Sequence, residues 1–240
     1  MTDLNHSFGQ FEVSSEERRQ RIRRVFQAVA PRYDLMNDLM SFGIHRLWKR
    51  FLAHAADPRP GQTIVDLAGG TGDVAKLLAG PDRHVVVCDP SAEMMERGKP
   101  GAPDSIAWLL GEAEAIPLPD GSVDTLTISF GIRNVTRLEA ALAEIMRVLK
   151  PGGKFICLEF SRPWGPVRPA YDLFSYLVIP RLGALIAKEP EAYDYLVESI
   201  RRFPDQEAFA ALIRQAGFKA VGYRNLTFGI ACLHMGIKPS

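Results

Sequence analysis

The sequence predicts an α/β fold in which a mostly parallel sheet, covered by helices, ends in an antiparallel strand. From residue 61 onward short apolar runs alternate with helical patterns, which is typical of parallel strands joined by helices. The last two apolar runs, 218–225 and 229–238, are separated by only a few residues, so they must pair as an antiparallel hairpin. The 240 residues, 47% hydrophobic and 24% charged, suit a single globular domain, 1–240.

Composition also narrows the class of protein. A net charge of +1 provides no electrostatic case for binding nucleic acid. The amino terminus lacks the layout of a signal peptide, so we expect a cytoplasmic protein. Cys88, Cys157 and Cys232 sit in apolar runs and are interpreted as core residues in a reducing compartment. The five histidines have no metal-ligand spacing, and we expect no metal site.

The first segment, about 1–58, is expected to form a helical cover. Ser14 and Glu17 make a capping box that begins a helix. One face of this helix is apolar, with Ile22, Val25, Phe26 and Val29. The opposite face is expected to carry five arginines: Arg18, Arg19, Arg21, Arg23 and Arg24. Two interpretations of that face stay open, a solvated surface and a surface that meets anionic lipid. Residues 32–52 predict two short helices.

The second segment, 61–160, is expected to be the cofactor-binding core. Its strands are predicted at 63–68, 84–89, 105–111, 122–130 and 154–160. A helix over 137–153, ended by Pro151 and Gly152, is expected between the fourth and fifth strands.

Two further segments complete the chain. An insertion over 161–203 begins with several prolines and continues with an apolar run, 171–187. That run is too short for a membrane span and contains Pro180 and Arg181, so it is interpreted as a helical lid. The last segment, 204–240, is predicted to hold a helix over 206–217 and the terminal hairpin.

The stretch "VDLAGGTGD" (65–73) predicts a strand, a glycine turn and the start of a helix. Glycines at such a turn let a ligand approach the backbone closely. Gly70, Gly72 and Ala75 also satisfy the G-x-G-x-x-A dinucleotide pattern, so NAD is a serious alternative. Asp89, at the end of the second strand, could hold a ribose hydroxyl pair in either case.

Asp66, immediately before the glycines, favours a cationic cofactor. A pyrophosphate beside this carboxylate would be repelled, whereas S-adenosylmethionine carries a cationic ammonium and sulfonium. Two unit charges about 4 Å apart at an effective dielectric of 20 interact by roughly 4 kcal/mol. The alternative interpretation is that Asp66 only caps amides of the loop.

The fourth strand delivers a charged residue to its own carboxyl end. Leu126, Ile128 and Phe130 alternate with polar residues, and Arg133 with Asn134 follow directly. In open α/β sheets ligands bind outside the carboxyl ends of the strands. Arg133 is therefore a candidate functional residue, although it could simply pair with a surface acid.

These residues together resemble the class I methyltransferases, and more narrowly the ubiquinone/menaquinone biosynthesis C-methyltransferase family. The resemblance spans most of the chain and rests on long motifs: "YDLMNDLMSFGIHRLWK", "DLAGGTGD", "SFGIRNV", "LKPGGKFICLEFS", "YLVESIRRFPDQ" and "YRNLTFGIACLHMG". It implies a Rossmann-like seven-stranded sheet with an antiparallel terminal strand, an amino-terminal helical cover and a helical insertion after the fifth strand.

The resemblance implies S-adenosylmethionine as the cofactor. Its contacts would be Thr71 in the loop, Asp89 on the ribose, Glu112 and Ala113 near the adenine, and Ser129 on the fourth strand. The loop and charge arguments above add Asp66, Gly70 and Gly72. The family usually has Asp or Asn where this chain has Glu112, which could shift the adenine contact to the backbone of Ala113. For the substrate, Tyr33, Met36, Phe174 and Tyr176 offer apolar and aromatic surface, although each could equally be a core residue.

The implied reaction is methyl transfer from the sulfonium to a ring carbon of a polyprenylated benzoquinol or naphthoquinol. The ring attacks well once a hydroxyl loses its proton, and Arg133 could favour the phenolate. A guanidinium has no lone pair to act as the base. A water held by Arg133 and Asn134 is the preferred proton acceptor; Glu159 is the alternative acceptor, or it anchors the lid.

Three alternatives stay open at this point: a methyltransferase for another apolar aromatic, an NAD-dependent oxidoreductase, and a non-catalytic cofactor-binding member of a quinone-synthesis assembly. Because the polyprenyl tail of the implied substrate resides in the bilayer, we expect the arginine-rich helix and the apolar lid to make peripheral contact with the inner face of the membrane. Apolar surface on the insertion makes a homodimer plausible.

Overall fold

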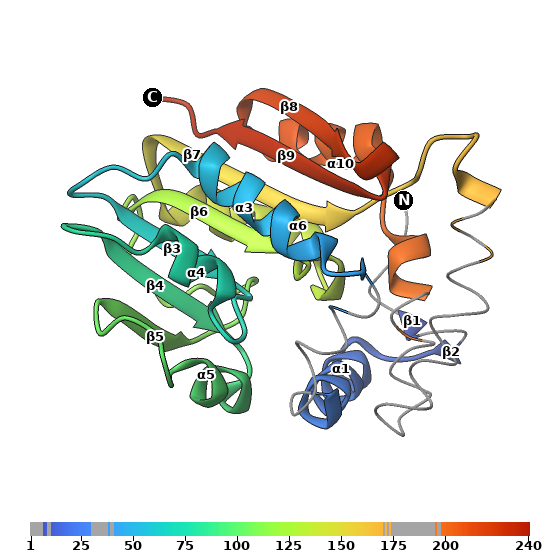
Figure 1. Cartoon of the computed structure of the whole chain (residues 1–240), viewed down its shortest axis with the longest axis horizontal. Coiled ribbons are helices and arrows are strands. Elements are labelled where there is room, and N and C mark those ends of the chain that lie inside the picture. The colour runs from blue at the N-terminus through green and yellow to red at the C-terminus, as the bar shows by residue number, and fades with distance from the viewer. Residues whose placement is uncertain are drawn as a thin grey trace.

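A computed structural model of the chain describes residues 7–8, 11–29, 38, 41–169, 171, 173, 195 and 198–240. Its centre is a seven-stranded sheet with the order β5-β4-β3-β6-β7-β9-β8 (Figure 1). The strands are β3 (Thr63–Leu67), β4 (His84–Asp89), β5 (Ile106–Leu110), β6 (Val123–Ser129), β7 (Leu149–Phe160), β8 (Lys219–Leu226) and β9 (Ala231–Ile237). A separate two-stranded sheet pairs β1 (Ser7–Phe8) with β2 (Phe11–Glu12).

Strand direction confirms the predicted architecture. The first five strands of the large sheet pair in parallel. β9 is antiparallel to both neighbours, β7 and β8. The hairpin was predicted from its short connection, but its second strand lies between β7 and β8, so β8 is the edge of the sheet.

Two buried clusters lie on the two faces of the sheet, because neighbouring residues of a strand point to opposite faces. On one face Ile64 and Ile156 pack with α3 (Ile44–Ala56) and α4 (Asp73–Leu78). On the other face Val65 and Phe155 pack with α6 (Leu138–Val148) and α10 (Gln206–Gln215). The result is a three-layer α/β domain (Figure 1).

Helix α1 (Ser15–Val29) begins as the capping box predicted, with the Glu17 amide donating to Ser14 Oγ at 3.1 Å. In Figure 1 this helix lies outside the two helical layers, beyond the edge of the sheet toward which the arrow of β6 points. Helix α5 (Ala92–Gly98) follows β4 and is capped by Ser91. Both helices contribute to the cavity described below.

The predicted end of the helix over 137–153 is wrong. α6 ends at Val148, and Pro151 and Gly152 lie inside the first part of β7. Strand pairing decides the boundary: Leu149 is already opposite Val123, and the register then shifts before the regular pairing at Lys154. The Gly152 amide donates to the carbonyl of Lys238, so this irregular start is held by the end of the chain.

Some predictions concern residues outside this description. Tyr33, Met36, Phe174 and Tyr176 all lie outside the described residues, as does most of the apolar run of the insertion. Within the described part of the chain, no helix is long and apolar enough to cross a bilayer. Cys88, Cys157 and Cys232 are buried and carry no disulfide.

Candidate functional site

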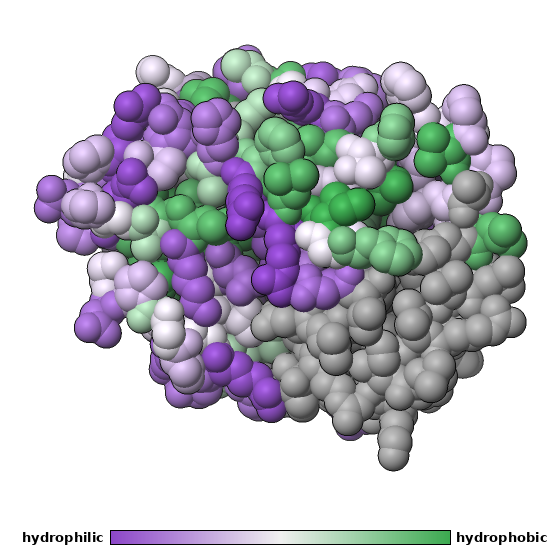
Figure 2. Space-filling model, viewed as in Figure 1, coloured by the Kyte–Doolittle hydropathy of each residue, from purple (hydrophilic) through white to green (hydrophobic). Residues whose placement is uncertain are grey.

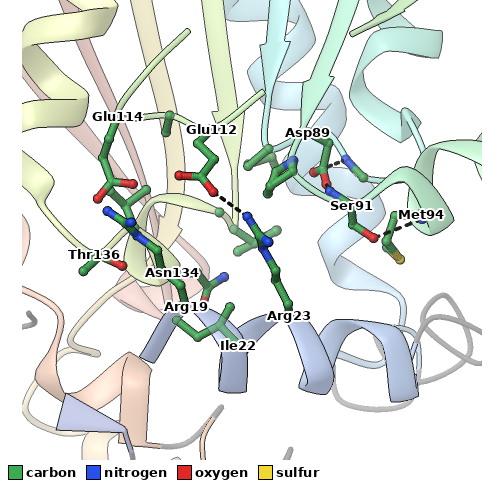
Figure 3. A pocket seen from close by; sticks show the side chains of 18 residues that line it. Arg19, Ile22, Arg23, Asp89, Ser91, Met94, Glu112, Glu114, Asn134 and Thr136 are labelled. Carbon is green, nitrogen blue, oxygen red and sulfur yellow. Dashed lines mark hydrogen bonds and ion pairs between the residues drawn. The ribbon is translucent and has the colours of Figure 1, made fainter. Parts of the chain in front are cut away.

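A cavity opens where β3, β4 and β6 end at their carboxyl sides (Figure 3). Gly70, Asp89 and Ser129 line it from the sheet side, each just past or at the end of its strand. Helix α1 closes it from the opposite side with Ile22 and Arg23. The cavity therefore lies where ligands bind in open α/β sheets, and the cover helix forms one of its walls.

The loop between β3 and α4 has a backbone that only small residues allow. Gly70 and Gly72 have φ values of 55° and 74°, in the left-handed region. A Cβ on Gly72 would also lie 2.8 Å from the ring of Trp108. Gly98 of α5 supports the same loop, because a Cβ there would lie 2.3 Å from the carbonyl oxygen of Thr71. The glycines thus permit both the turn and its close packing.

Asp66 lies behind this loop and is absent from the cavity wall. Its Oδ2 accepts from the Ala75 amide at 3.1 Å, and its Oδ1 accepts from Thr127 Oγ1 at 3.1 Å. Burial raises the pKa of Asp66 to about 7. These contacts favour the alternative interpretation, in which this carboxyl braces the loop, and the contact with a charged cofactor stays a prediction.

Asp89 does face the cavity. Its Oδ2 accepts from the Gly70 amide and its Oδ1 from the Ser91 amide, each at 2.8 Å. Burial raises the pKa of this carboxyl above its usual range, while the two amide bonds oppose the shift. A carboxylate has about four lone-pair directions, so two bonded amides leave acceptors for ligand hydroxyl groups.

Three of the five arginines of α1 do not lie on the outer face predicted for them, whereas Arg24 is exposed as predicted. Arg18 is buried, and its Nη1 donates to the carbonyls of Asn134 and Val135 at 3.2 and 3.1 Å. It also donates to Thr136 Oγ1 at 3.3 Å and, through Nη2, to the carbonyl of Arg133 at 3.3 Å. The sequence held a signal for this, because Arg18 precedes the buried Ile22 by four residues and shares its face.

Arg19 and Arg23 also face inward, toward the cavity. Figure 3 shows Arg23 extending from α1 across the cavity to Glu112, and its Nη2 lies 2.6 Å from Glu112 Oε1. Glu112, expected near an adenine, is thus at the cavity but is already paired with a cation. Its neighbour Ala113 is buried and also lines the cavity.

Arg133 and Glu159 form a buried ion pair beside the cavity. Arg133 Nη1 donates to Glu159 Oε1 at 2.7 Å and to the carbonyl of Phe130 at 2.6 Å. Burial raises the pKa of Glu159 even though Arg133 opposes the shift. Neither side chain is part of the cavity wall, whereas Asn134 is. The three predicted catalytic residues are therefore brought together, with Asn134 in front.

Ser129 Oγ and Arg133 Nε are among the buried polar atoms that have no hydrogen-bond partner within the described part of the chain. Buried polar atoms are nearly always paired, so atoms without partners beside a cavity are candidates for contact with a ligand or an ordered water. Thr71 lies in the loop, where its Oγ1 donates to Asp73 Oδ1 at 3.3 Å.

Tyr195 is a residue of this site that no local pattern indicated. It is buried, and its hydroxyl donates to Asn134 Oδ1 at 2.9 Å. The two residues are 61 positions apart, so only the folded chain brings them together.

Comparisons with known proteins agree on one family. A model of the ubiE/COQ5 methyltransferase family matches residues 13–238. A protein of Rubrivivax gelatinosus named ubiquinone/menaquinone biosynthesis C-methyltransferase UbiE is 65% identical over 99% of this chain and 94% of its own length. A protein of the same name from Caulobacter vibrioides is 50% identical over 98% of this chain and 99% of its own length.

Solved structures support the fold. A methyltransferase in complex with the Trm112 activator of Haloferax volcanii has a TM-score of 0.67 at 18% identity, covering 90% of this chain and 98% of its own. An S-adenosylmethionine-dependent methyltransferase of Thermotoga maritima has a TM-score of 0.65 at 23% identity, with the same two coverages.

Proposed function

The chain belongs to the ubiE/COQ5 methyltransferase family, and we propose that it transfers the methyl group of S-adenosylmethionine to a ring carbon of a polyprenylated benzoquinol or naphthoquinol. The observation that carries the proposal is the family match over 13–238, which includes every described residue of the cavity wall. The reaction belongs to ubiquinone or menaquinone biosynthesis, as the names of the relatives state for those proteins.

The residues present fit the cofactor. Asp89 would hold the ribose hydroxyls, Gly70 and Gly72 would let the ligand approach the loop, and Ala113 would contact the adenine. Ser129 Oγ, buried and unpaired in the described structure, would gain a partner. When bound, S-adenosylmethionine supplies a methyl group on a positively charged sulfur.

The start of α4 supports S-adenosylmethionine over NAD, the alternative raised by the glycine pattern. A pyrophosphate would lie at this helix start, where the carboxylate of Asp73 is held by Lys49 Nζ at 2.9 Å. A phosphate there would lie beside a carboxylate, whereas S-adenosylmethionine carries no phosphate.

Activation of the ring is assigned to Arg133 and Asn134. A phenol has a pKa near 10, so the site must stabilise the phenolate at neutral pH. A charge-assisted hydrogen bond to the oxygen, or to a water beside it, contributes roughly 1.5–3 kcal/mol, on the order of tenfold to 150-fold in rate. Arg133 retains Nε for this contact, because its Nη1 is engaged by Glu159 and Phe130.

This arrangement gives Glu159 a different role from that of a proton acceptor. Its carboxylate is engaged by the Arg133 side chain, by the Arg133 amide at 3.4 Å and by the Phe160 amide at 2.8 Å. We therefore assign Glu159 to holding the guanidinium in place. A water held by Arg133 takes the proton from the ring hydroxyl and passes it to bulk solvent.

The experiment that tests the proposal measures methyl transfer by mass. The purified chain is incubated with S-adenosylmethionine and a demethylated quinol analogue, and calorimetry compares the binding of S-adenosylmethionine with that of NAD. We expect a product heavier by one methyl group and binding of S-adenosylmethionine alone. Binding of NAD, or cofactor binding without methyl transfer to any quinol, would contradict the proposal.

Arg133→Ala tests the assigned chemistry. Cofactor affinity should stay within a few-fold while methyl transfer falls at least tenfold. Because the substitution leaves Glu159 buried without its cation, it is paired with Arg133→Ala/Glu159→Ala, which removes that carboxylate. The double variant should regain thermal stability without regaining activity, and Arg24→Ala, an exposed site on α1, is the control. Unchanged turnover of Arg133→Ala would remove its role.

Peripheral membrane contact is proposed for a different surface from the one the sequence indicated, because Arg18, Arg19 and Arg23 face inward. Figure 2 shows apolar side chains gathered on the surface around α3. The exposed apolar residues there are Phe42, Ile44, Leu47 and Phe51. Flotation with anionic liposomes tests this: Leu47→Glu should weaken binding, whereas Leu77→Glu, an exposed leucine on α4, should not.

A further inference from the structure

Asn134 is held by two residues from parts of the chain that are far apart in sequence. Arg18, 116 positions earlier, donates to its carbonyl oxygen at 3.2 Å. Tyr195, 61 positions later, donates its hydroxyl to the side-chain Oδ1 at 2.9 Å. The amino-terminal cover, the insertion and the loop after β6 therefore meet at one residue on the cavity wall.

The tyrosine contact decides which end of the amide is free. Because Oδ1 accepts from Tyr195, the Asn134 Nδ2 group is the end left for other partners. No described residue accepts a hydrogen bond from Nδ2. Asn134 therefore has two N–H donors available to whatever occupies the cavity.

Whether the Asn134 side chain presents a donor or an acceptor to the substrate matters for the chemistry proposed above. An amide N–H stabilises an oxygen that carries negative charge, such as a phenolate, whereas a carbonyl oxygen turned toward it would repel it. Without the tyrosine hydroxyl, rotation of the amide by half a turn would exchange the two groups. We propose that Tyr195 is a positioning residue for methyl transfer, which fixes the Asn134 amide with its N–H groups toward the ring oxygen of the substrate; this inference rests on the proposed function.

The surroundings of Tyr195 suit this role. Its ring packs with Val13, Ile22 and Val25 in a small buried cluster between α1 and the loop, so it has little freedom to move. Burial raises the pKa of Tyr195, which keeps the hydroxyl protonated and able to donate at neutral pH. Arg18 adds to the arrangement by holding the backbone carbonyls of 133, 134 and 135.

Tyr195→Phe removes the hydroxyl and retains the ring. We expect kcat for methyl transfer to fall about threefold to tenfold, the range for loss of one hydrogen bond, with cofactor affinity unchanged. Asn134→Asp keeps an acceptor for Tyr195 but replaces the donors with an anionic oxygen, so its kcat should fall at least as far as that of Asn134→Ala. Tyr223→Phe, on the exposed edge strand, is the matched control.

A double-mutant cycle distinguishes positioning from mere structural support. If Tyr195 acts through Asn134, then Tyr195→Phe has no further effect on kcat in an Asn134→Ala background. An equal loss in both backgrounds would overturn the inference, as would a Tyr195→Phe variant with the turnover of the parent chain.

A second readout does not depend on turnover. The side-chain NH2 signals of Asn134, identified by their loss in Asn134→Ala, should shift in a nitrogen-15 NMR spectrum when Tyr195 becomes Phe. Unchanged signals would overturn the positioning role even if the parent chain were inactive on every quinol. Shifted signals in a chain that methylates no quinol would support the contact and count against the proposed function instead.

Discussion

Replacing Arg18 with methionine tests how α1 is attached to the site. Met retains most of the apolar stem and removes a buried guanidinium that donates to three carbonyls and one hydroxyl. If the wall of the cavity is held by these bonds, the substitution should destabilise the whole domain and weaken cofactor binding. If Arg18 were solvated, as the helical pattern first suggested, the substitution would change neither the stability of the domain nor its binding of the cofactor.

The magnitude follows from the contacts. Each buried acceptor left without a donor costs about 1–3 kcal/mol. The four hydrogen-bond distances, 3.1–3.3 Å, lie at the long end of the usual range, and the variant no longer has to bury a cation. The cost per acceptor is therefore taken from the low end of the energy range, about 1 kcal/mol. For three carbonyls this is about 3 kcal/mol. In a domain of this size such a loss lowers Tm by about 6–12 °C.

Differential scanning calorimetry measures this change. Arg24→Met is the matched control, because Arg24 lies on the same helix and is exposed; its Tm should stay within about 2 °C of the parent chain, as for other surface substitutions. Equal shifts for the two variants would refute the reasoning. Arg18→Lys, which keeps the charge but cannot reach three carbonyls at once, should fall between the parent and Arg18→Met.

Three further predictions concern the loop and the cavity. The pKa of Asp66 is about 7 in the folded chain against 3.8 ordinarily, so between these pH values the folded chain keeps a proton that the unfolded chain loses. The resulting stabilisation is full below about pH 4 and lost by about pH 7, so the free energy of unfolding of Asp66→Asn should rise relative to that of the parent by on the order of 4 kcal/mol across this interval. Urea unfolding measures this, and a difference that does not change with pH would contradict it. Gly98→Ala, whose Cβ would lie 2.3 Å from the Thr71 carbonyl oxygen, should weaken S-adenosylmethionine binding at least tenfold in calorimetry, whereas Gly165→Ala, with open space around it, should not. Arg23→Ala should speed cofactor release by at most about fivefold at low salt, because the ion pair of Arg23 with Glu112 is partly exposed. Stopped-flow release rates that depend on salt equally in the parent chain and the variant would count against a role for this ion pair.

Local patterns in the sequence predict the large sheet but not the small sheet of β1 and β2. Short apolar runs indicate the seven strands of the large sheet, and helical spacing indicates α6 and α10, because both patterns depend on residues close together in the chain. The rule that parallel strands end at one edge then places Asp89, Ser129 and Asn134 together, and the cavity confirms that placement.

Contacts between distant residues are what the sequence could not provide. The end of α6 depends on pairing between Leu149 and Val123, and the inward position of Arg18 on carbonyls 115 to 117 residues away. The same holds for the ion pair of Arg133 with Glu159 and for Asp66, which faces Thr127 rather than the cavity.

The sequence by itself determined the order of strands and helices, the glycine turn and the edge of the sheet where ligands bind. Only the tertiary structure decided which way each polar side chain turns at that edge, including the donor end of Asn134. The physical reason is that a buried charge or amide must find partners wherever the folded chain brings them, and those partners are set by packing rather than by spacing along the chain.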